Sequence, residues 1–249
     1  MSDFNRGYSR TTAVGAADMA VDAGLRAFML GVYNKVALGL VLSAAMAFVT
    51  SQVAPVRDLM YRVTADGRLL GLTLIGMIVA VSPLAVLLIG RMAFRQSVRS
   101  SGAVYWLVVA LFGASLGDIA LLYQVGSIFA TFLVTATAFG GLSLVGYTTK
   151  RDLTGFGSFL IVGLIGLIVA SVVNMFLHSG ALDFAVNVIG VLIFAGLIAF
   201  DTQRLKITYY QMGGDQAALG VATNYGALSL YLDFLNLFLF LLRLFGGRR

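Results

Sequence analysis

Two aspartates stand inside apolar stretches of the sequence, where a carboxylate needs a physical explanation. Asp201 directly follows the apolar run 191–200, and Asp233 lies well inside the run 224–246. An ionised side chain at the centre of a membrane helix costs about 2.5–3.5 kcal/mol on insertion scales, so it usually faces a binding site or a water-filled path. A third aspartate, Asp118, is predicted near the outer end of its helix, where it reaches interfacial water.

Asp201 and Asp233 are expected to meet. If the helix before Asp201 runs one way and the helix of Asp233 runs back, a short continuation of the first brings the two carboxyl groups level. Two carboxylates at close range in a low dielectric cannot both ionise easily, so we expect them to share protons and to titrate as a unit near neutral pH. Such a pair is both a transient cation site and a pH sensor. The alternative for Asp201 is a local ion pair with Arg204, one helical turn away.

Polar residues at helical spacing accompany Asp233. Ser229 precedes it by four residues, Asn236 follows by three, and Arg243 lies seven residues further on the same face. We expect this polar stripe to turn into the bundle and support the acid pair. The alternative is that the stripe only holds helices together through hydrogen bonds.

Three arginines are candidates for a latch that closes on the deprotonated pair. Arg91, Arg95 and Arg99 recur every four residues, so they share one face of an extended helix. The same pattern also fits an ordinary anchor at the cytoplasmic surface.

Composition places the chain in a membrane. Hydrophobic residues make up 59% and charged residues 11% of the 249 residues, with a mean hydropathy of +0.94. A water-soluble domain of this length would need much more polar surface. The sequence has no cysteine and one histidine, which excludes disulfides and cysteine or histidine metal clusters. Its net charge of +6 is spread over helix ends, so it does not indicate nucleic-acid binding.

Seven apolar runs are each long enough to cross a hydrocarbon layer about 30 Å thick as a helix. The sequence therefore predicts an all-α integral membrane protein, a seven-helix bundle in one domain over 27–249 after a cytoplasmic tail at 1–26. The predicted helices lie near 28–53, 69–90, 103–123, 126–147, 155–177, 184–201 and 224–246.

The distribution of Lys and Arg predicts a cytoplasmic N-terminus. With that orientation ten basic residues lie in cytoplasmic segments and six on the opposite side, which is the usual bias of short loops. Small residues also recur at four-residue spacing, a pattern that lets helix backbones approach closely. The pairs are Gly113 with Gly117, Ala136 with Gly140, and Gly166 with Ala170.

Two aspartate motifs carry a family resemblance. The run 192–206, which contains Phe-Asp-Thr-Gln-Arg, and the run 227–238, which contains Leu-Tyr-Leu-Asp-Phe, are followed by Leu-Leu-Arg-Leu-Phe-Gly at 241–246. Together they resemble the Bax inhibitor-1 (TMBIM) family, and Gly-Tyr-Thr-Thr-Lys-Arg-Asp at 146–152 resembles its bacterial branch.

The resemblance implies a seven-helix fold with a central C-terminal helix in the bacterial inner membrane. It also implies a pH-sensitive calcium leak whose acid pair maps onto Asp201 and Asp233, with calcium as permeant and no resident cofactor. In the family an arginine on the second helix can latch to one acid; Arg95 is the best match, with Arg91 and Arg99 as substitutes. A bacterial relative is linked to binding a membrane protease, a partner that no residue motif carries over.

Two other functions remain open. One is a secondary transporter that exchanges protons for a cation or small solute, although the halves of the chain show no convincing internal repeat. The other is a regulator that transports nothing and binds another membrane protein through its small-residue faces. An enzyme is not expected, since the sequence lacks Cys, Glu and a Gly-rich phosphate loop. An aspartyl membrane protease would need its acids in a loop-like, Gly-flanked context, which neither acid has.

Overall fold

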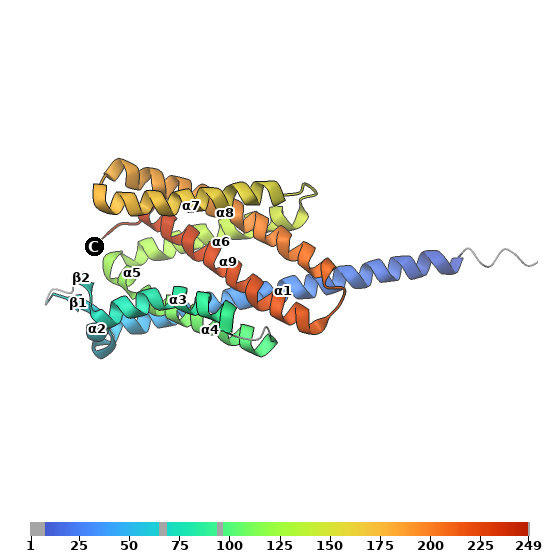
Figure 1. Cartoon of the computed structure of the whole chain (residues 1–249), viewed down its shortest axis with the longest axis horizontal. Coiled ribbons are helices and arrows are strands. Elements are labelled where there is room, and N and C mark those ends of the chain that lie inside the picture. The colour runs from blue at the N-terminus through green and yellow to red at the C-terminus, as the bar shows by residue number, and fades with distance from the viewer. Residues whose placement is uncertain (1–7, 65–68, 94–96, 249) are drawn as a thin grey trace, which may run out of the picture.

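The computed structural model describes residues 8–64, 69–93 and 97–248, with side chains from residue 23 onward except 90–93. Helices dominate this part of the chain, and one short antiparallel hairpin interrupts them (Figure 1). The helices are α1 (Tyr8–Gln52), α2 (Ala54–Met60), α3 (Leu74–Ala93), α4 (Val98–Ser115), α5 (Gly117–Leu122), α6 (Val125–Thr148), α7 (Thr154–Leu177), α8 (Gly180–Gln211) and α9 (Gln216–Phe245). The hairpin pairs β1 (Tyr61–Val63) with β2 (Leu69–Leu72).

Local sequence signals begin and end the helices. Ser97 accepts a hydrogen bond from the Ser100 amide at the start of α4, and the Asp215 carboxylate accepts from the amides of Ala217 and Ala218 at the start of α9. Side-chain caps of this kind satisfy amides that have no partner within the helix. Between α8 and α9, Gly213 and Gly214 adopt φ angles of +56° and +89°, which glycine tolerates best. This tight turn sends α9 back along α8.

Six helical segments of the described chain are long and apolar enough to cross a membrane. They confirm an all-α membrane protein, but the predicted count of seven is not confirmed. The predicted helix 69–90 starts as strand β2, and its apolar helical part, Leu74–Ile89, is shorter than the other spans. The predicted helix 184–201 is longer than expected, because α8 continues to Gln211.

The C-terminal helix α9 lies at the centre of the bundle. It packs against α8, α1, α4 and α6, and more of its apolar segment is buried than that of any other span in the described chain. In Figure 1 it runs obliquely between α7 and α8 on one side and α1, α3 and α4 on the other. Side chains of α9 therefore face several neighbouring helices at once.

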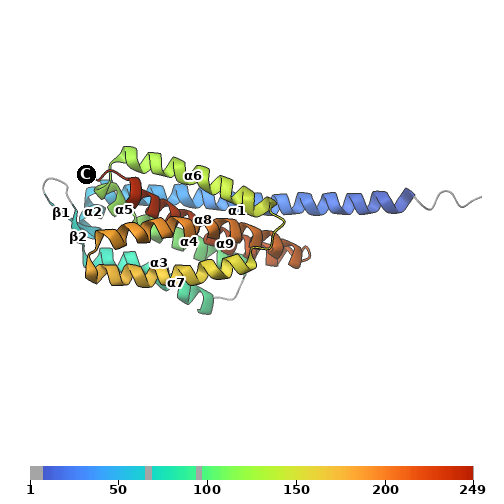
Figure 2. The same cartoon turned by 90° about the horizontal axis from the view of Figure 1, so that it is seen from above.

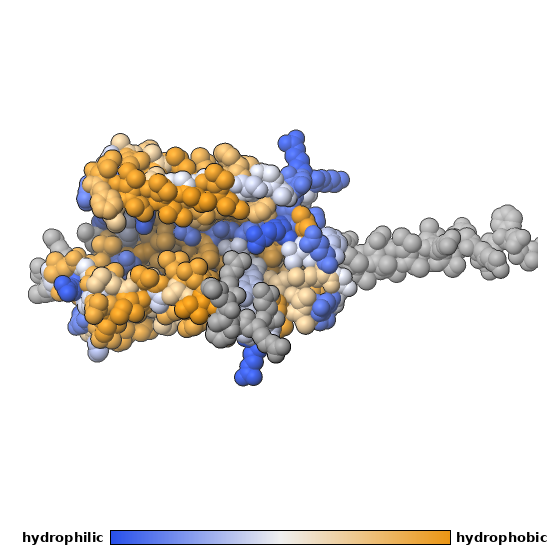
Figure 3. All heavy atoms as spheres, in the orientation of Figure 1, coloured by the Kyte–Doolittle hydropathy of each residue, from blue (hydrophilic) through white to orange (hydrophobic). Residues whose placement is uncertain are grey.

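The outer surface is apolar. Leu88, Phe159 and Phe176 are about 70% exposed, as expected for side chains covered by lipid. Figure 3 shows these apolar surfaces over the flanks of the bundle and hydrophilic residues toward one end. The start of α1 and the C-terminus lie at opposite ends of the molecule (Figures 1 and 2).

Only some of the small-residue pairs form close helix contacts. A Cβ atom at Gly113 would overlap the backbone of Ser43 on α1, so this glycine lets α4 approach α1 closely. At Gly140 and Gly166 a Cβ would meet no atom within 4 Å. The close-packing prediction is therefore wrong for these two glycines, whose faces are open.

Candidate functional site

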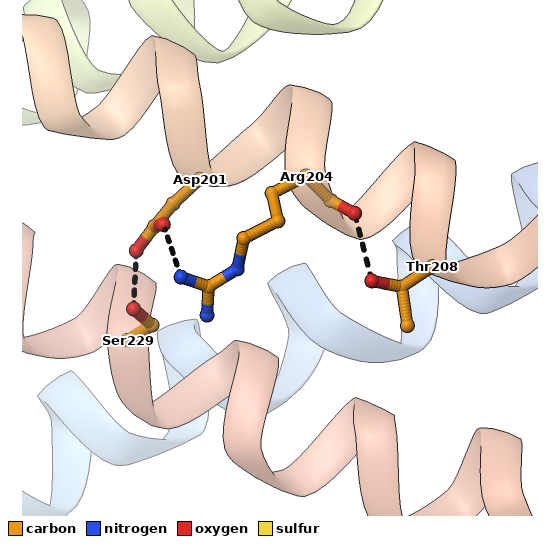
Figure 4. Close-up of polar contacts among 4 residues, drawn as sticks. All are labelled: Asp201, Arg204, Thr208 and Ser229. Carbon is orange, nitrogen blue, oxygen red and sulfur yellow. Dashed lines mark hydrogen bonds and ion pairs between the residues drawn. The ribbon is translucent and has the colours of Figure 1, made fainter. Parts of the chain in front are cut away.

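Asp201 lies inside α8 with its carboxyl group buried against α9. The residue is only 6% exposed, and its Oδ2 accepts a hydrogen bond from the Ser229 hydroxyl on α9. Its Oδ1 lies 3.3 Å from Nη1 of Arg204, one turn further along α8. Figure 4 shows the Arg204 side chain folding back toward Asp201, while Ser229 approaches from the neighbouring helix. Asp201 thus makes both the local ion pair and a contact between helices.

Asp233 lies one turn beyond Ser229 on α9 and faces the same carboxyl group. It is 6% exposed, and its carboxyl group is close enough to Asp201 for the two to interact electrostatically. Two carboxylates are both acceptors, so a hydrogen bond between them forms only when one of them carries a proton. The Oδ2 atom of Asp233 is buried and has no hydrogen-bond partner in the structure. The arrangement therefore leaves one acceptor position for a proton or a cation.

Arg204 is the cation that faces both acids. Its electrostatic attraction reaches Asp233 as well as Asp201, and its side chain is 56% exposed. Its backbone carbonyl accepts a hydrogen bond of 2.8 Å from Thr208 (Figure 4). The Arg204 side chain thus contacts a buried carboxyl group and is itself more than half exposed.

A cavity of about 470 Å³ opens beside Asp233, between α7, α8 and α9. Ser171, Ser229 and Asn236 supply its other polar groups, and the remaining walls are apolar. In the part of the chain that has side chains, no three His, Cys, Asp or Glu residues gather to hold a metal ion. The site therefore offers a cation two carboxylates and a hydroxyl, with water left to supply further ligands.

A second cavity of about 390 Å³ lies further along α9 and carries charge. Asp118 on α5 lines it together with Arg243 and Arg248, and Asn236 lines both cavities. Asp118, set aside from the sequence as an interfacial acid, thus faces a cavity inside the bundle. We call this second cavity the outer cavity. The three residues of the predicted polar stripe have different surroundings: Ser229 contacts Asp201, and Arg243 lines the outer cavity. Asn236 lies between the two cavities and donates a hydrogen bond of 2.8 Å to the Leu232 carbonyl.

Tyr61 of β1 packs against the junction between α4 and α5. Its hydroxyl lies 3.2 Å from the Ala114 carbonyl, and burial, together with the nearby Asp118 carboxylate, raises the pKa of Tyr61 to about 12. The phenol therefore stays protonated and remains a donor at physiological pH.

Of the three candidate latch arginines, only Arg99 has a described side chain, and no contact between Arg99 and the pair is seen. Arg95 lies outside the described residues, and Arg91 belongs to α3 at a position whose side chain is also outside them. Arg99 is exposed on the first turn of α4. The latch prediction thus stays a prediction, and Arg204 is the arginine seen at the acids.

Comparison with known proteins places this geometry in a family. The family description "Inhibitor of apoptosis-promoting Bax1" matches residues 25–249. The chain belongs to the Bax inhibitor-1 family. A Caulobacter vibrioides protein is 64% identical over the full length of both chains. The inner membrane protein YbhL of Escherichia coli is 44% identical over 91% of this chain and 94% of its own, and a Rickettsia prowazekii protein is 42% identical over 97% and 98%.

Within this Bax inhibitor-1 family chain, two residues shortly after Asp201 tie α8 to neighbouring segments. Gln203 accepts from the Leu153 amide at 2.8 Å and donates to the Arg151 carbonyl at 2.6 Å, which holds the loop between α6 and α7. Lys206 donates to the Tyr147 carbonyl at 3.0 Å, near the end of α6. This part of the motif therefore fixes the position of α8, and with it the position of Asp201.

Sequence reasoning missed a second polar cluster, between α1, α4 and α9. The Lys35 ammonium donates to Asn224 at 2.5 Å, and Asn224 donates to Ser101 at 2.8 Å and to the Val98 carbonyl at 3.0 Å. Asn224 is 2% exposed. The sequence offers only a weak signal for this cluster, namely that Asn224 lies nine residues before Asp233. Near the start of a helix, the sequence alone does not show whether an asparagine side chain is buried or exposed, because that depends on the neighbouring helices.

Proposed function

We propose that this protein is a pH-sensitive leak for a cation, with calcium as the physiological ion, and that Asp201 and Asp233 form its proton- and cation-binding element. The observation that carries the proposal is the electrostatic coupling of two buried carboxyl groups from different helices, with an acceptor on Asp233 that has no hydrogen-bond partner. Buried acids are costly in a membrane protein, so they are retained where protons or cations must be bound.

The local charges support a cation that competes with protons. Two ionised carboxylates against one guanidinium leave one net negative charge, whereas one added proton makes the group neutral. Calcium in proteins takes about 6–8 oxygen ligands. The acid pair and Ser229 supply fewer protein oxygen ligands than this, and water molecules supply the rest. Calcium would therefore bind weakly and could be released again, as a leak requires.

The two cavities support a route to the pair. The outer cavity holds Asp118, Arg243 and Arg248, and Asn236 lies in the wall that it shares with the cavity of Asp233. On the other side of the pair, the exposed part of Arg204 reaches the polar end of α8. A cation leaving the outer cavity would pass Asn236, bind at the acids, and leave past Arg204 once this guanidinium swings away from Asp201.

The proposal includes a seventh crossing by α3 and a cytoplasmic N-terminus in a bacterial inner membrane. The start of α1 and the C-terminus lie at opposite ends of the bundle, which supports an odd number of crossings. The excess of basic residues on the N-terminal side supports the orientation. The inner membrane is the location named for the E. coli relative.

Arg204 is the proposed closing cation in this conformation. It is bound to Asp201 and interacts with Asp233, so its departure would expose both acids. A latch by Arg91, Arg95 or Arg99 would belong to a different conformation, in which the segment 91–99 moves toward α8.

Calcium flux from the purified full chain in liposomes, at several pH values, tests the function. Asp201→Asn and Asp233→Asn are expected to abolish the pH response of the flux, whereas Asp58→Asn, an exposed acid paired with Arg57, leaves it unchanged. Unchanged flux and pH response in both variants would remove the pair from the mechanism. Saturable flux with counterflow would replace the leak by a transporter, and an inert protein that captures a stable partner would replace it by a regulator.

A further inference from the structure

A deep crevice separates α1 from α6 on the lipid-facing side of the bundle. Three adjoining hollows of about 430, 400 and 480 Å³ follow one another along the two helices. The first and second share Tyr33 and Phe139, and the second and third share Leu40 and Phe132. Figure 2 shows α6 running alongside α1 over the depth of the bundle. The hollows therefore form one groove, which is distinct from the acid pair.

The middle hollow of the groove is almost entirely apolar, and polar residues lie toward both ends, with Ser43, Ser51 and Gln52 in the third hollow. Arg26, Ser143 and Tyr147 line the hollow nearest the start of α1. Lys206 lies beside this end, with its ammonium 5.6 Å from the centre of the Tyr147 ring. The groove thus offers hydrocarbon contacts in the middle of the membrane and positive charge at its surface.

Ser143 supplies an independent sign of a ligand. It is 5% exposed, and its Oγ is buried without any hydrogen-bond partner in the structure. A hydroxyl in hydrocarbon surroundings is costly when it is unpaired. Other hydroxyls of the same helix avoid this cost, since Thr135 and Thr148 donate to the carbonyls four residues earlier at 2.8 and 2.7 Å. Ser143 therefore lines the groove with a hydroxyl that has no acceptor in the described chain.

We propose that this crevice binds one anionic phospholipid, with its phosphate at Arg26, an ester oxygen at Ser143, and an acyl chain along the groove past Tyr33 and Phe139. The dimensions fit a single leaflet. Arg26 and Leu40 lie about 21 Å apart along α1, close to the roughly 20–22 Å of half a bilayer with its head groups. Ser143 is about 7.5 Å from the end of α6, at the depth of the glycerol esters.

An open glycine completes the site. Gly140 lines the groove, and a Cβ atom there would meet nothing within 4 Å, so the space beside it is available to a chain from outside. Its neighbour Gly141 is equally free of contacts but lines none of the three hollows. The two glycines are thus a matched pair for a test: Gly140→Leu fills the crevice, while Gly141→Leu adds the same side chain outside it.

Native mass spectrometry of the purified full chain, titrated with dioleoylphosphatidylglycerol or dioleoylphosphatidylcholine, tests the proposal. We expect one tightly retained phosphatidylglycerol per chain, a loss of at least fivefold in its affinity for Gly140→Leu, and wild-type affinity for Gly141→Leu. Arg26→Gln should weaken phosphatidylglycerol by about fivefold and phosphatidylcholine much less, since one basic residue near the membrane contributes roughly that preference. Arg99→Gln, an exposed arginine on α4, is the control. Ser143→Ala should weaken both lipids by about threefold.

Several results would overturn the proposal. Equal affinities for the Gly140 and Gly141 variants would show that the lipid lies elsewhere, and an unchanged preference in Arg26→Gln would remove the head-group contact. Displacement by excess inorganic phosphate would indicate a site for a free anion. Cross-linking of position 140 to a second polypeptide in native membranes would assign the groove to a protein helix instead.

A second measurement decides the question if Gly140→Leu fails to fold. The chain has one tryptophan, Trp106 on α4. A Phe139→Trp variant in a Trp106→Phe background reports from inside the groove. Its fluorescence should be quenched more strongly by brominated phosphatidylglycerol than by brominated phosphatidylcholine in mixed vesicles, and equal quenching by the two lipids would contradict the proposal.

Discussion

The Ser229 hydroxyl on α9 donates a hydrogen bond to Asp201 on α8, one helical turn before Asp233. This contact connects the two helices that carry the acids. It fixes the position of Asp201 along the axis of α9, one turn from Asp233. It also turns one oxygen of Asp201 toward Ser229 and leaves the other to Arg204. The geometry of the pair thus depends on a serine hydroxyl that carries no charge.

Ser229→Ala should loosen the pair without changing its charge. We expect a loss of about 1 kcal/mol in stability, within the range of hydrogen bonds between membrane helices, and a shifted pH response of calcium flux. Ser229→Thr keeps the hydroxyl and should restore the pH response. Thermal unfolding in detergent and liposome flux measure the two effects. A pH response in Ser229→Ala equal to wild type would show that the hydroxyl does not position the acids.

Replacement of Arg204 should change the pH response in a defined direction. Arg204→Gln removes the positive charge beside the acid pair, so the midpoint of the pH response should move upward. Arg204→Lys keeps the charge and should move it much less. Calcium flux between pH 5 and 9 measures the midpoints. A downward shift in the glutamine variant would contradict the assignment of Arg204 as counter-ion.

Calcium and protons should compete at the pair. A cation binds the ionised carboxylates, so its binding must release protons, and the half-saturating calcium concentration should rise as the pH falls. Calcium titrations of purified protein at several pH values, with proton release followed by a dye in weak buffer, measure this linkage. Asp233→Asn should remove the proton release, and calcium binding that is independent of pH in the wild type would exclude the competition.

Gly146 allows α6 to pack directly on α8. A Cβ at this position would overlap the backbone of Ala199, two residues before Asp201, so Gly146→Ala should lower the stability by about 1–3 kcal/mol. Gly141→Ala on the same helix has free space and should raise it slightly, because alanine favours helix. Opposite shifts in the unfolding temperature are expected. A stabilised Gly146→Ala would mean that the two helices can separate without cost.

Much of the architecture could be predicted from the sequence. Long apolar runs indicate a helical membrane protein, because in hydrocarbon the backbone amides find partners only within a helix or a closed barrel. The same reasoning singled out Asp201 and Asp233, since a carboxylate among apolar neighbours stands out in a one-dimensional pattern. The position of Asp118 at the outer cavity was not predicted. Asp118 lies close to the end of its predicted helix, so contact with interfacial water already explained a charged residue there.

The sequence by itself determined that the chain lies in lipid and which acids are costly there, since both follow from residue types and spacing along one helix. Only the tertiary structure decided which groups those acids contact. That Ser229 reaches Asp201, that the Arg204 side chain folds back onto Asp201, and that the Ser143 hydroxyl has no partner in the described chain all depend on how far neighbouring helices extend and rotate. Those quantities arise from side-chain packing between segments distant in sequence, which local periodicity does not encode.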